Sequence, residues 1–158
     1  MATRPSPDTE AGEFVGQLFF WLWRASHTRF AAALESVGLT TALFGLLNFL
    51  GGREGAIQQE IGSEMGIDPS TMVSLIDELE SEGLAKRQPH PTDRRAREVA
   101  ITPKGRRVLE RARRMANQVE DEVLTGLTAA ERRQLLKLLR RTLGSAPPQP
   151  LWRAEEGD

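Results

Sequence analysis

The segment from Asp68 to Thr102 constrains the fold of this chain more than any other part of its sequence. Asp68 and Pro69 belong to the residue types that are favoured at the N-cap and in the first turn of a helix. A helix is therefore expected from Pro69 to about Glu82. Gly83 suits the end of this helix, because glycine adopts the left-handed conformation that helix C-termini commonly require.

A two-stranded hairpin is expected after this helix. Short strands are predicted at about 85–88 and 98–101, where Val99 and Ile101 alternate with polar residues. The loop between the strands, PHPTDRRAR, is too long for a tight turn and strongly basic. Another helix is expected before the segment, at about 57–65, ending at Gly66. Two helices joined by a short turn, followed by a strand, a basic loop and a strand, predict a winged helix-turn-helix.

The helix from Pro69 has two chemically different faces. Its inner face is predicted to consist of apolar side chains, namely Met72, Leu75, Ile76 and Leu79. Its outer face carries Ser70 and Ser74 in the first two turns, with Thr71 on the flank, and Asp77 and Glu78 towards the end. Because phosphate repels an acidic surface, the N-terminal half is expected to enter the major groove of DNA, as in other helix-turn-helix proteins.

Charge is unevenly distributed along the chain. The stretch from Lys86 to Arg114 contains eleven basic and three acidic residues, a local net charge of +8, although the whole chain has a net charge of -1. A localised basic field on an acidic protein favours a polyanionic partner over a membrane. For a single arginine, a solvated helix face is the simpler explanation, but the cluster and the hairpin together favour DNA.

Size and composition exclude several classes of protein. With 158 residues, the chain is long enough for one domain with its own core. It has no cysteine, which excludes disulfides, thiolate zinc sites and thiol-based sensors. No catalytic constellation is present, so no catalytic residue, metal or cofactor is expected and the chain is not predicted to be an enzyme. The apolar run from Leu18 to Trp23 is too short to span a membrane, and the cytoplasm is the expected compartment.

Long helices are expected on both sides of the winged domain. One should run from about 11 to 37, and two more from about 103 to 125 and from 129 to 143. Thr102 is the expected N-cap of the first of these two, and Thr128 with Glu131 matches a capping box at the start of the second. A shorter helix is expected from about Thr40, its likely N-cap, to Leu50. Trp21 and Trp23 point about 200° apart on a helix, and one helix of a small monomer cannot easily bury both. A second subunit would cover them most simply, and a ligand pocket against one tryptophan is the alternative.

The chain resembles the MarR family of bacterial transcription regulators. The resemblance extends from Leu18 to Leu143, and its most specific parts are STMVSLIDELESEGLAKR and PTDRRAREVAITPKG. It implies a mainly α fold with a small β-wing: a winged helix-turn-helix at 39–102 and helical dimerisation segments at 11–38 and 103–143, with flexible tails at 1–10 and 144–158. It further implies a homodimer, a palindromic double-stranded operator, repression, and release by a small aromatic or anionic molecule.

The resemblance also implies roles for individual residues. Ser70, Thr71 and Ser74 would face the major groove. Arg94 and Arg95 would lie at the wing tip over the minor groove, oriented by Asp93, although an aspartate there is also a common turn former. The complete set of expected DNA-binding residues is Ser70, Thr71, Ser74, Arg87, Asp93, Arg94, Arg95 and Arg97.

The predicted recognition helix departs from the family pattern in one respect. It contains no lysine or arginine from Ser70 to Glu82, so arginine on this helix cannot read guanine in the bidentate manner. Shape readout and phosphate contacts are therefore expected to carry a large share of the binding.

Such a fold could also serve as a ligand-independent DNA-binding or protein-interaction module. A steep decrease in affinity with salt would separate DNA binding from protein contact.

A ligand pocket is the remaining question. The expected ligand-binding residues are Trp21, Trp23, Arg24, His27 and Phe44. Arg24 and His27 lie three residues apart on one helix and could together contact a carboxylate or phenolate. The alternative is that the aromatic residues belong to the core or the dimer interface, where large rings are common.

Overall fold

The computed structural model describes residues 14–53, 55–90 and 97–144. This part of the chain is mainly helical and contains one small antiparallel sheet, as predicted. Its elements are α1 (Val15–Glu35), α2 (Thr41–Gly51), β1 (Ala56–Ile57), α3 (Gln58–Met65), α4 (Pro69–Ser81), β2 (Ala85–Pro89), β3 (Arg97–Ile101), α5 (Pro103–Val123) and α6 (Ala129–Leu143).

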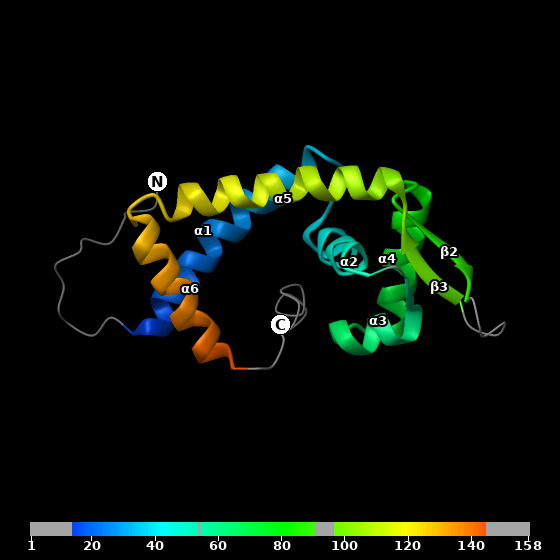
Figure 1. Ribbon diagram of the computed structural model, residues 1–158, viewed down its shortest axis with the longest axis horizontal. Helices are drawn as coiled ribbons and strands as arrows, with labels where there is room; N and C mark the ends of the chain where they lie inside the picture. The colour runs from blue at the N-terminus through cyan, green and yellow to red at the C-terminus, as the bar shows by residue number, and fades with distance from the viewer. Residues whose placement is uncertain (1–13, 54, 91–96, 145–158) are drawn as a thin grey trace.

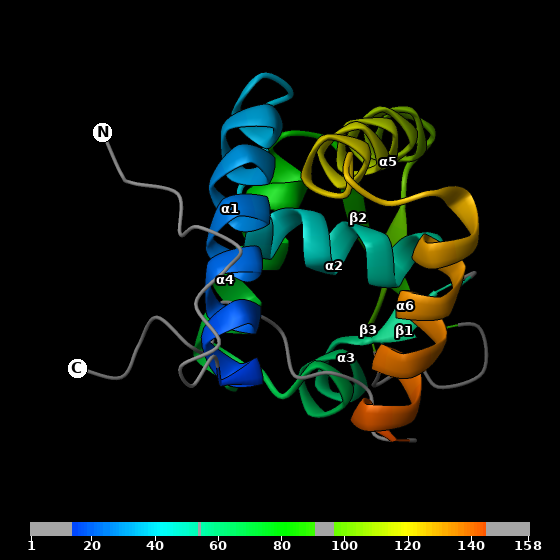
Figure 2. The ribbon, with the colours of Figure 1, turned by 90° about the vertical axis from the view of Figure 1, so that its left-hand side faces the viewer.

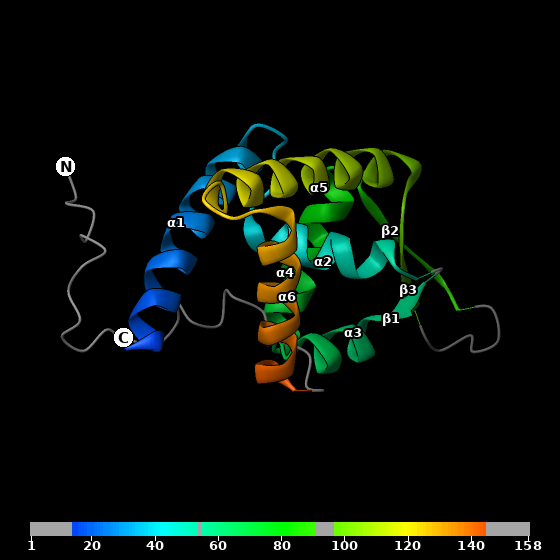
Figure 3. The same cartoon turned by 60° about the vertical axis from the view of Figure 1, so that its left-hand side comes forward.

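The long helix α5 connects two groups of elements (Figure 1). The sheet, α3 and α4 lie at the end where α5 begins, and α1 and α6 lie at the other end. α1 packs along α5, whereas α6 turns away from the end of α5 and descends on a different side from α1 (Figure 2). The turned view shows α6 extending well below α5 (Figure 3).

The sheet has the strand order β1-β3-β2, with both pairings antiparallel. The hairpin pairs Ala85 with Ile101 and Pro89 with Arg97, so both predicted strands are confirmed within one residue. β1 was not predicted: Ile57 was expected in the helix, but it is extended and pairs with Glu98. A strand of two residues is too short to show an alternating pattern, and only its contact with β3 defines it.

The core of the winged domain lies between α2, α3, α4 and the sheet. The predicted inner stripe of α4 is buried, and Ile76 and Leu79 are completely inaccessible. Completely inaccessible residues from the neighbouring elements are Leu46, Leu47, Ile61 and Val99. This core supports α4 from one side only, so that the outer face of α4 remains exposed.

Side-chain caps determine where four of the helices begin. Thr40 accepts a hydrogen bond from the Leu43 amide, and Thr102 accepts one from the Gly105 amide. Thr128 forms the predicted capping box with Glu131, whose pKa is lowered mainly by its hydrogen bond with the Thr128 hydroxyl. Such caps satisfy amide groups that have no partner within the helix, which is why these starts could be predicted from sequence.

The two helices farthest from the winged domain expose much apolar surface. In α1, Phe20 is 50% exposed and Trp21 47% exposed; in α6, Leu136 is 48% exposed and Leu143 58% exposed. No residue of α6 is buried. No helix in the described part of the chain is long and apolar enough to cross a membrane.

Candidate nucleic-acid interface

The start of α4 is organised by Asp68. Its carboxylate accepts hydrogen bonds from the amides of Ser70 and Thr71, both at 3.0 Å. The hydroxyl of Ser70 also donates to Asp68, at 2.5 Å. Hydrogen bonds from the side chains of Ser70 and Thr71, together with those from their amides, hold the pKa of Asp68 well below its usual range. Gly66, with a φ of 65°, ends α3 and allows the short turn into α4.

Replacing this cap should change how stability depends on pH. Because the pKa of Asp68 is lower in the folded protein, its stabilising contribution is complete above the unfolded-state pKa of about 3.9 and is lost as the pH falls below it. We expect Asp68→Ala to lower the Tm at neutral pH, and the difference from wild type to shrink in acid. Asp68→Asn retains a capping oxygen and should lower the Tm less. A Tm difference between wild type and Asp68→Ala that is the same at neutral pH and in acid would contradict this role.

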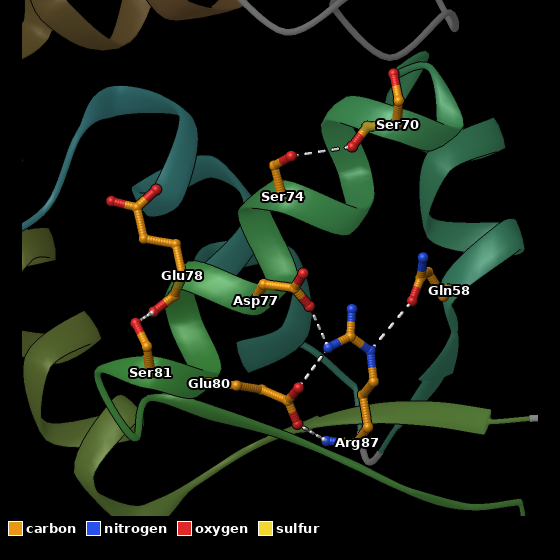
Figure 4. A network of polar contacts seen from close by, with 8 residues as sticks. All are labelled: Gln58, Ser70, Ser74, Asp77, Glu78, Glu80, Ser81 and Arg87. Carbon is orange, nitrogen blue, oxygen red and sulfur yellow. Dashed lines mark hydrogen bonds and ion pairs between the residues drawn. The ribbon is translucent and has the colours of Figure 1, made fainter.

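The outer face of α4 has the expected hydroxyls and one apolar residue that was not predicted. Ser70 and Ser74 lie on the same side of the helix (Figure 4) and are exposed. Thr71 is half-buried, in agreement with its predicted place on the flank. Val73, which sequence reasoning did not single out, is 40% exposed. The sequence already indicated that Val73 is exposed, because it does not belong to the apolar repeat that forms the inner stripe.

The hydroxyl protons on this face are used within the helix. Ser70 donates its proton to Asp68, and Ser74 donates to the carbonyl oxygen of Ser70 at 3.2 Å (Figure 4). A hydroxyl group has one donor and two acceptor lone pairs. With their protons engaged, Ser70 and Ser74 therefore present acceptors to an incoming ligand.

Arg87 is held against α4 by a network of polar contacts (Figure 4). Its guanidinium donates to Asp77 at 2.6 Å, to Glu80, and to Gln58 at 3.3 Å, while its amide donates to Glu80. Burial alone would lower the pKa of Arg87, but the hydrogen bonds and charges of Asp77 and Glu80 raise it overall. The predicted DNA-binding residue Arg87 thus connects β2 to α4.

The other predicted wing residues are only partly described. Arg97 begins β3 and is exposed, opposite Pro89 at the end of β2. Asp93, Arg94 and Arg95 lie outside the described residues. Their expected place at the wing tip therefore remains a prediction.

The basic residues between Lys86 and Arg114 that the structure describes lie on two elements, the hairpin and α5. Lys86, Arg87 and Arg97 belong to the hairpin, whereas six of the basic residues lie on α5. Lys104 donates to the carbonyl oxygen of Glu82 at 2.6 Å, and Arg113 donates twice to Asn48, at 3.0 and 2.8 Å. These two residues connect α5 to the winged domain. The remaining basic residues of α5, all exposed, are Arg106, Arg107, Arg111 and Arg114.

A shallow hollow of about 510 Å³ lies along α1. It brings together two of the five predicted ligand-binding residues, Trp21 and Arg24. The other residues that line it are Ala25, Thr28 and Arg29. The hollow combines an aromatic ring with two cationic side chains, which is a suitable chemistry for an aromatic anion.

The other predicted ligand-binding residues lie in different surroundings. Trp23 stacks on His27 with ring centroids 4.9 Å apart, and Phe44 packs edge-on against Phe30 at 5.0 Å. The indole nitrogen of Trp23 is buried and has no hydrogen-bond acceptor among the described residues. The hollow along α1 therefore contains Trp21 and Arg24 of the predicted set, and the ligand-binding role of all five residues remains a prediction.

The exposed helix face and the adjoining antiparallel hairpin define a winged helix-turn-helix protein. A model of the MarR family matches residues 37–96. A transcriptional regulatory protein for the hcr operon of Thauera aromatica is 32% identical over 134 residues, which cover 82% of this chain and 81% of the relative. The chain belongs to the MarR family of DNA-binding transcriptional regulators.

Two solved structures extend this comparison. A MarR family protein of Mycobacterium tuberculosis in complex with DNA is 25% identical, with a TM-score of 0.71 and coverage of 85% of this chain and 100% of that chain. CouR from Rhodococcus jostii, bound to p-coumaroyl-CoA, is 25% identical, with a TM-score of 0.71 and coverage of 89% of this chain and 99% of that chain. Similar folds thus occur both with DNA and with an anionic aromatic thioester.

Proposed function

We propose that this protein is a homodimeric repressor that binds a palindromic operator in the cytoplasm and is released by a small aromatic or anionic molecule. The observation that carries the proposal is the apolar surface that α1 and α6 expose in a single subunit. Phe20 and Trp21 on one helix and Leu136 and Leu143 on the other are each at least 47% exposed. Large apolar side chains exposed in this way are typical of protein interfaces.

A dimer formed through these helices has consequences for the DNA sequence. Two subunits related by a two-fold axis present two α4 helices in opposite orientations, so the operator should be an inverted repeat. Half-sites centred about one helical turn apart would fit such a dimer. The winged domain at 39–102 would bind DNA, and 11–38 together with 103–143 would form the dimer.

A role is proposed for each expected DNA-binding residue. Ser70, Thr71 and Ser74 would contact the major groove from the uncharged half of α4. Arg94 and Arg95 would enter the minor groove, with Asp93 orienting one of them, and Arg97 would contact phosphate. We give Arg87 a supporting role, because a direct contact with DNA would require it to leave Asp77 and Glu80.

The test is a selection of duplexes from a random pool, followed by titration of the best sequence. We expect saturable binding of one dimer to an inverted repeat, with an affinity that falls steeply as salt increases. Release by an aromatic anion such as a p-coumaroyl thioester would support the hollow beside Trp21 and Arg24 as the effector site. A stable monomer that binds no duplex at low ionic strength would overturn the proposal.

Replacing Arg95 should separate DNA contact from stability. We expect Arg95→Ala to weaken operator binding more than tenfold without changing the Tm, because a guanidinium in a narrow minor groove neutralises strong negative potential. Arg87→Ala is the matched comparison and should lower the Tm, because Asp77 and Glu80 lose their common partner. Gel-shift titration and thermal melting measure the two effects. Wild-type affinity of Arg95→Ala would refute the role of the wing.

A further inference from the structure

Val73 is exposed in a place that dimer formation does not explain. It is 40% exposed on α4, within the winged domain. All other large apolar side chains of comparable exposure in the described residues belong to α1, to Phe14 immediately before it, or to α6. Val73 lies in the second turn of α4, directly before Ser74 and three residues after Ser70. On a helix the three-residue spacing places Val73 beside Ser70, and Ser74 follows about 100° further around the helix axis.

The groups around Val73 are hydrogen-bond acceptors. The hydroxyl protons of Ser70 and Ser74 are directed to Asp68 and to the Ser70 carbonyl oxygen. No lysine or arginine occurs anywhere in α4. The outward surface of its first two turns therefore combines the methyl groups of one valine with acceptor oxygens.

The acidic residue that follows does not prevent close approach of a duplex. Asp77 lies one turn beyond Val73, and its carboxylate is paired with Arg87 at 2.6 Å. The pairing offsets the charge that would otherwise repel phosphate next to this part of the helix. Arg87 therefore supports the recognition surface electrostatically as well as through packing.

Only one base pair offers both an apolar group for the Val73 methyls and a hydrogen-bond donor for the serine oxygens. In the major groove, an A·T pair presents the thymine C5-methyl group and the donating 6-amino group of adenine. A G·C pair also offers an amino group, on cytosine, but it has no methyl group. We infer that Val73 contacts a thymine methyl in each half-site of the operator, and that Ser74 accepts a hydrogen bond from an adenine 6-amino group next to it. The inference rests on the proposed function, because it requires α4 to enter the major groove.

Removing one methyl group from the DNA tests the contact with Val73. Each thymine of one half-site of the selected operator is replaced in turn by deoxyuridine, which pairs identically but lacks the C5-methyl. At one position we expect wild-type affinity to fall about fourfold, as for the loss of one buried methyl-sized group. With Val73→Ala, the same replacement should have no effect at that position. Val73→Thr, which keeps one methyl group, should retain part of the sensitivity.

A second replacement tests the acceptor. The adenines of the same half-site are replaced in turn by purine, which lacks the 6-amino group. We expect one position to weaken binding by wild type and to have no further effect on Ser74→Ala. Ser81→Ala, at the exposed C-terminal end of α4, is the control and should respond to both DNA changes as wild type does.

The outcomes distinguish this inference from the proposed function. Suppose that wild type binds the selected operator and that every deoxyuridine replacement changes its affinity by the same factor as the affinity of Val73→Ala. In that case the role of Val73 is wrong and the proposed function stands. If no purine substitution distinguishes wild type from Ser74→Ala, the acceptor role is wrong. If wild type binds no duplex at all, the proposed function fails and this inference fails with it. Circular dichroism melting of each variant excludes misfolding as the cause.

Discussion

The double substitution Leu136→Glu and Leu143→Glu in α6 should convert the protein into a monomer. This monomer should bind the operator at least about a hundredfold more weakly, because it lacks the avidity that two linked sites normally provide. The two leucines lie seven residues apart on one side of α6 and are 48% and 58% exposed in the subunit. Burying a leucine at an interface contributes about 1.5–3 kcal/mol, whereas burying an unpaired carboxylate is strongly unfavourable. In a two-fold interface each substitution occurs twice.

A matched control separates the loss of the interface from the added charge. Gln134→Glu with Arg141→Gln makes the net charge more negative by the same amount, at positions two residues from each leucine and therefore on a different side of α6. This control should remain a dimer in sedimentation equilibrium and retain its affinity in gel-shift titrations. A leucine variant that sediments as a dimer with wild-type affinity would show that α6 does not form the interface.

Gly105→Ala should destabilise the protein by about 2–3 kcal/mol, the upper part of the range for overpacking a well-packed site. A Cβ atom at this position would lie 2.1 Å from the carbonyl oxygen of Leu84 and 2.9 Å from Ile101 Cγ1. The Leu84 carbonyl cannot move freely, because it accepts hydrogen bonds from the amide and the hydroxyl of Thr102. The substitution should therefore displace the start of α5 from the hairpin.

Gly16→Ala provides the comparison for this second prediction. Gly16 also lies within a helix, but a Cβ atom there would have nothing within 4 Å. Alanine should be favoured there by roughly 0.5–1 kcal/mol, because glycine loses more conformational freedom on helix formation. Urea unfolding would measure both changes. Equal effects of the two substitutions would mean that α5 does not approach Leu84 as closely as described.

Local interactions explain most of what could be predicted from the sequence. The helix starts at Thr40, Asp68, Thr102 and Thr128 depend on side chains that bond amides two or three residues away. The inner stripe of α4 depends on the helical repeat alone. These features needed no knowledge of distant segments.

The features that were missed depend on distant segments. β1 exists because two residues meet β3, about forty positions later. The DNA-binding role expected for Arg87 remains a prediction, but its partners were not foreseen: β2 carries it to Asp77 and Glu80 on α4. Four of the five predicted ligand-binding residues share a segment of α1, yet Trp21 and Arg24 line the hollow whereas Trp23 stacks on His27.

The sequence by itself determined the order of the elements, the ends of the helices and the uncharged outer surface of the first two turns of α4, because hydrogen bonds and side-chain contacts between near neighbours control them. Only the tertiary structure decided which charged residues are paired and which glycine lies against a backbone carbonyl. Those outcomes depend on how separate elements pack, and a linear pattern does not contain the distances between them.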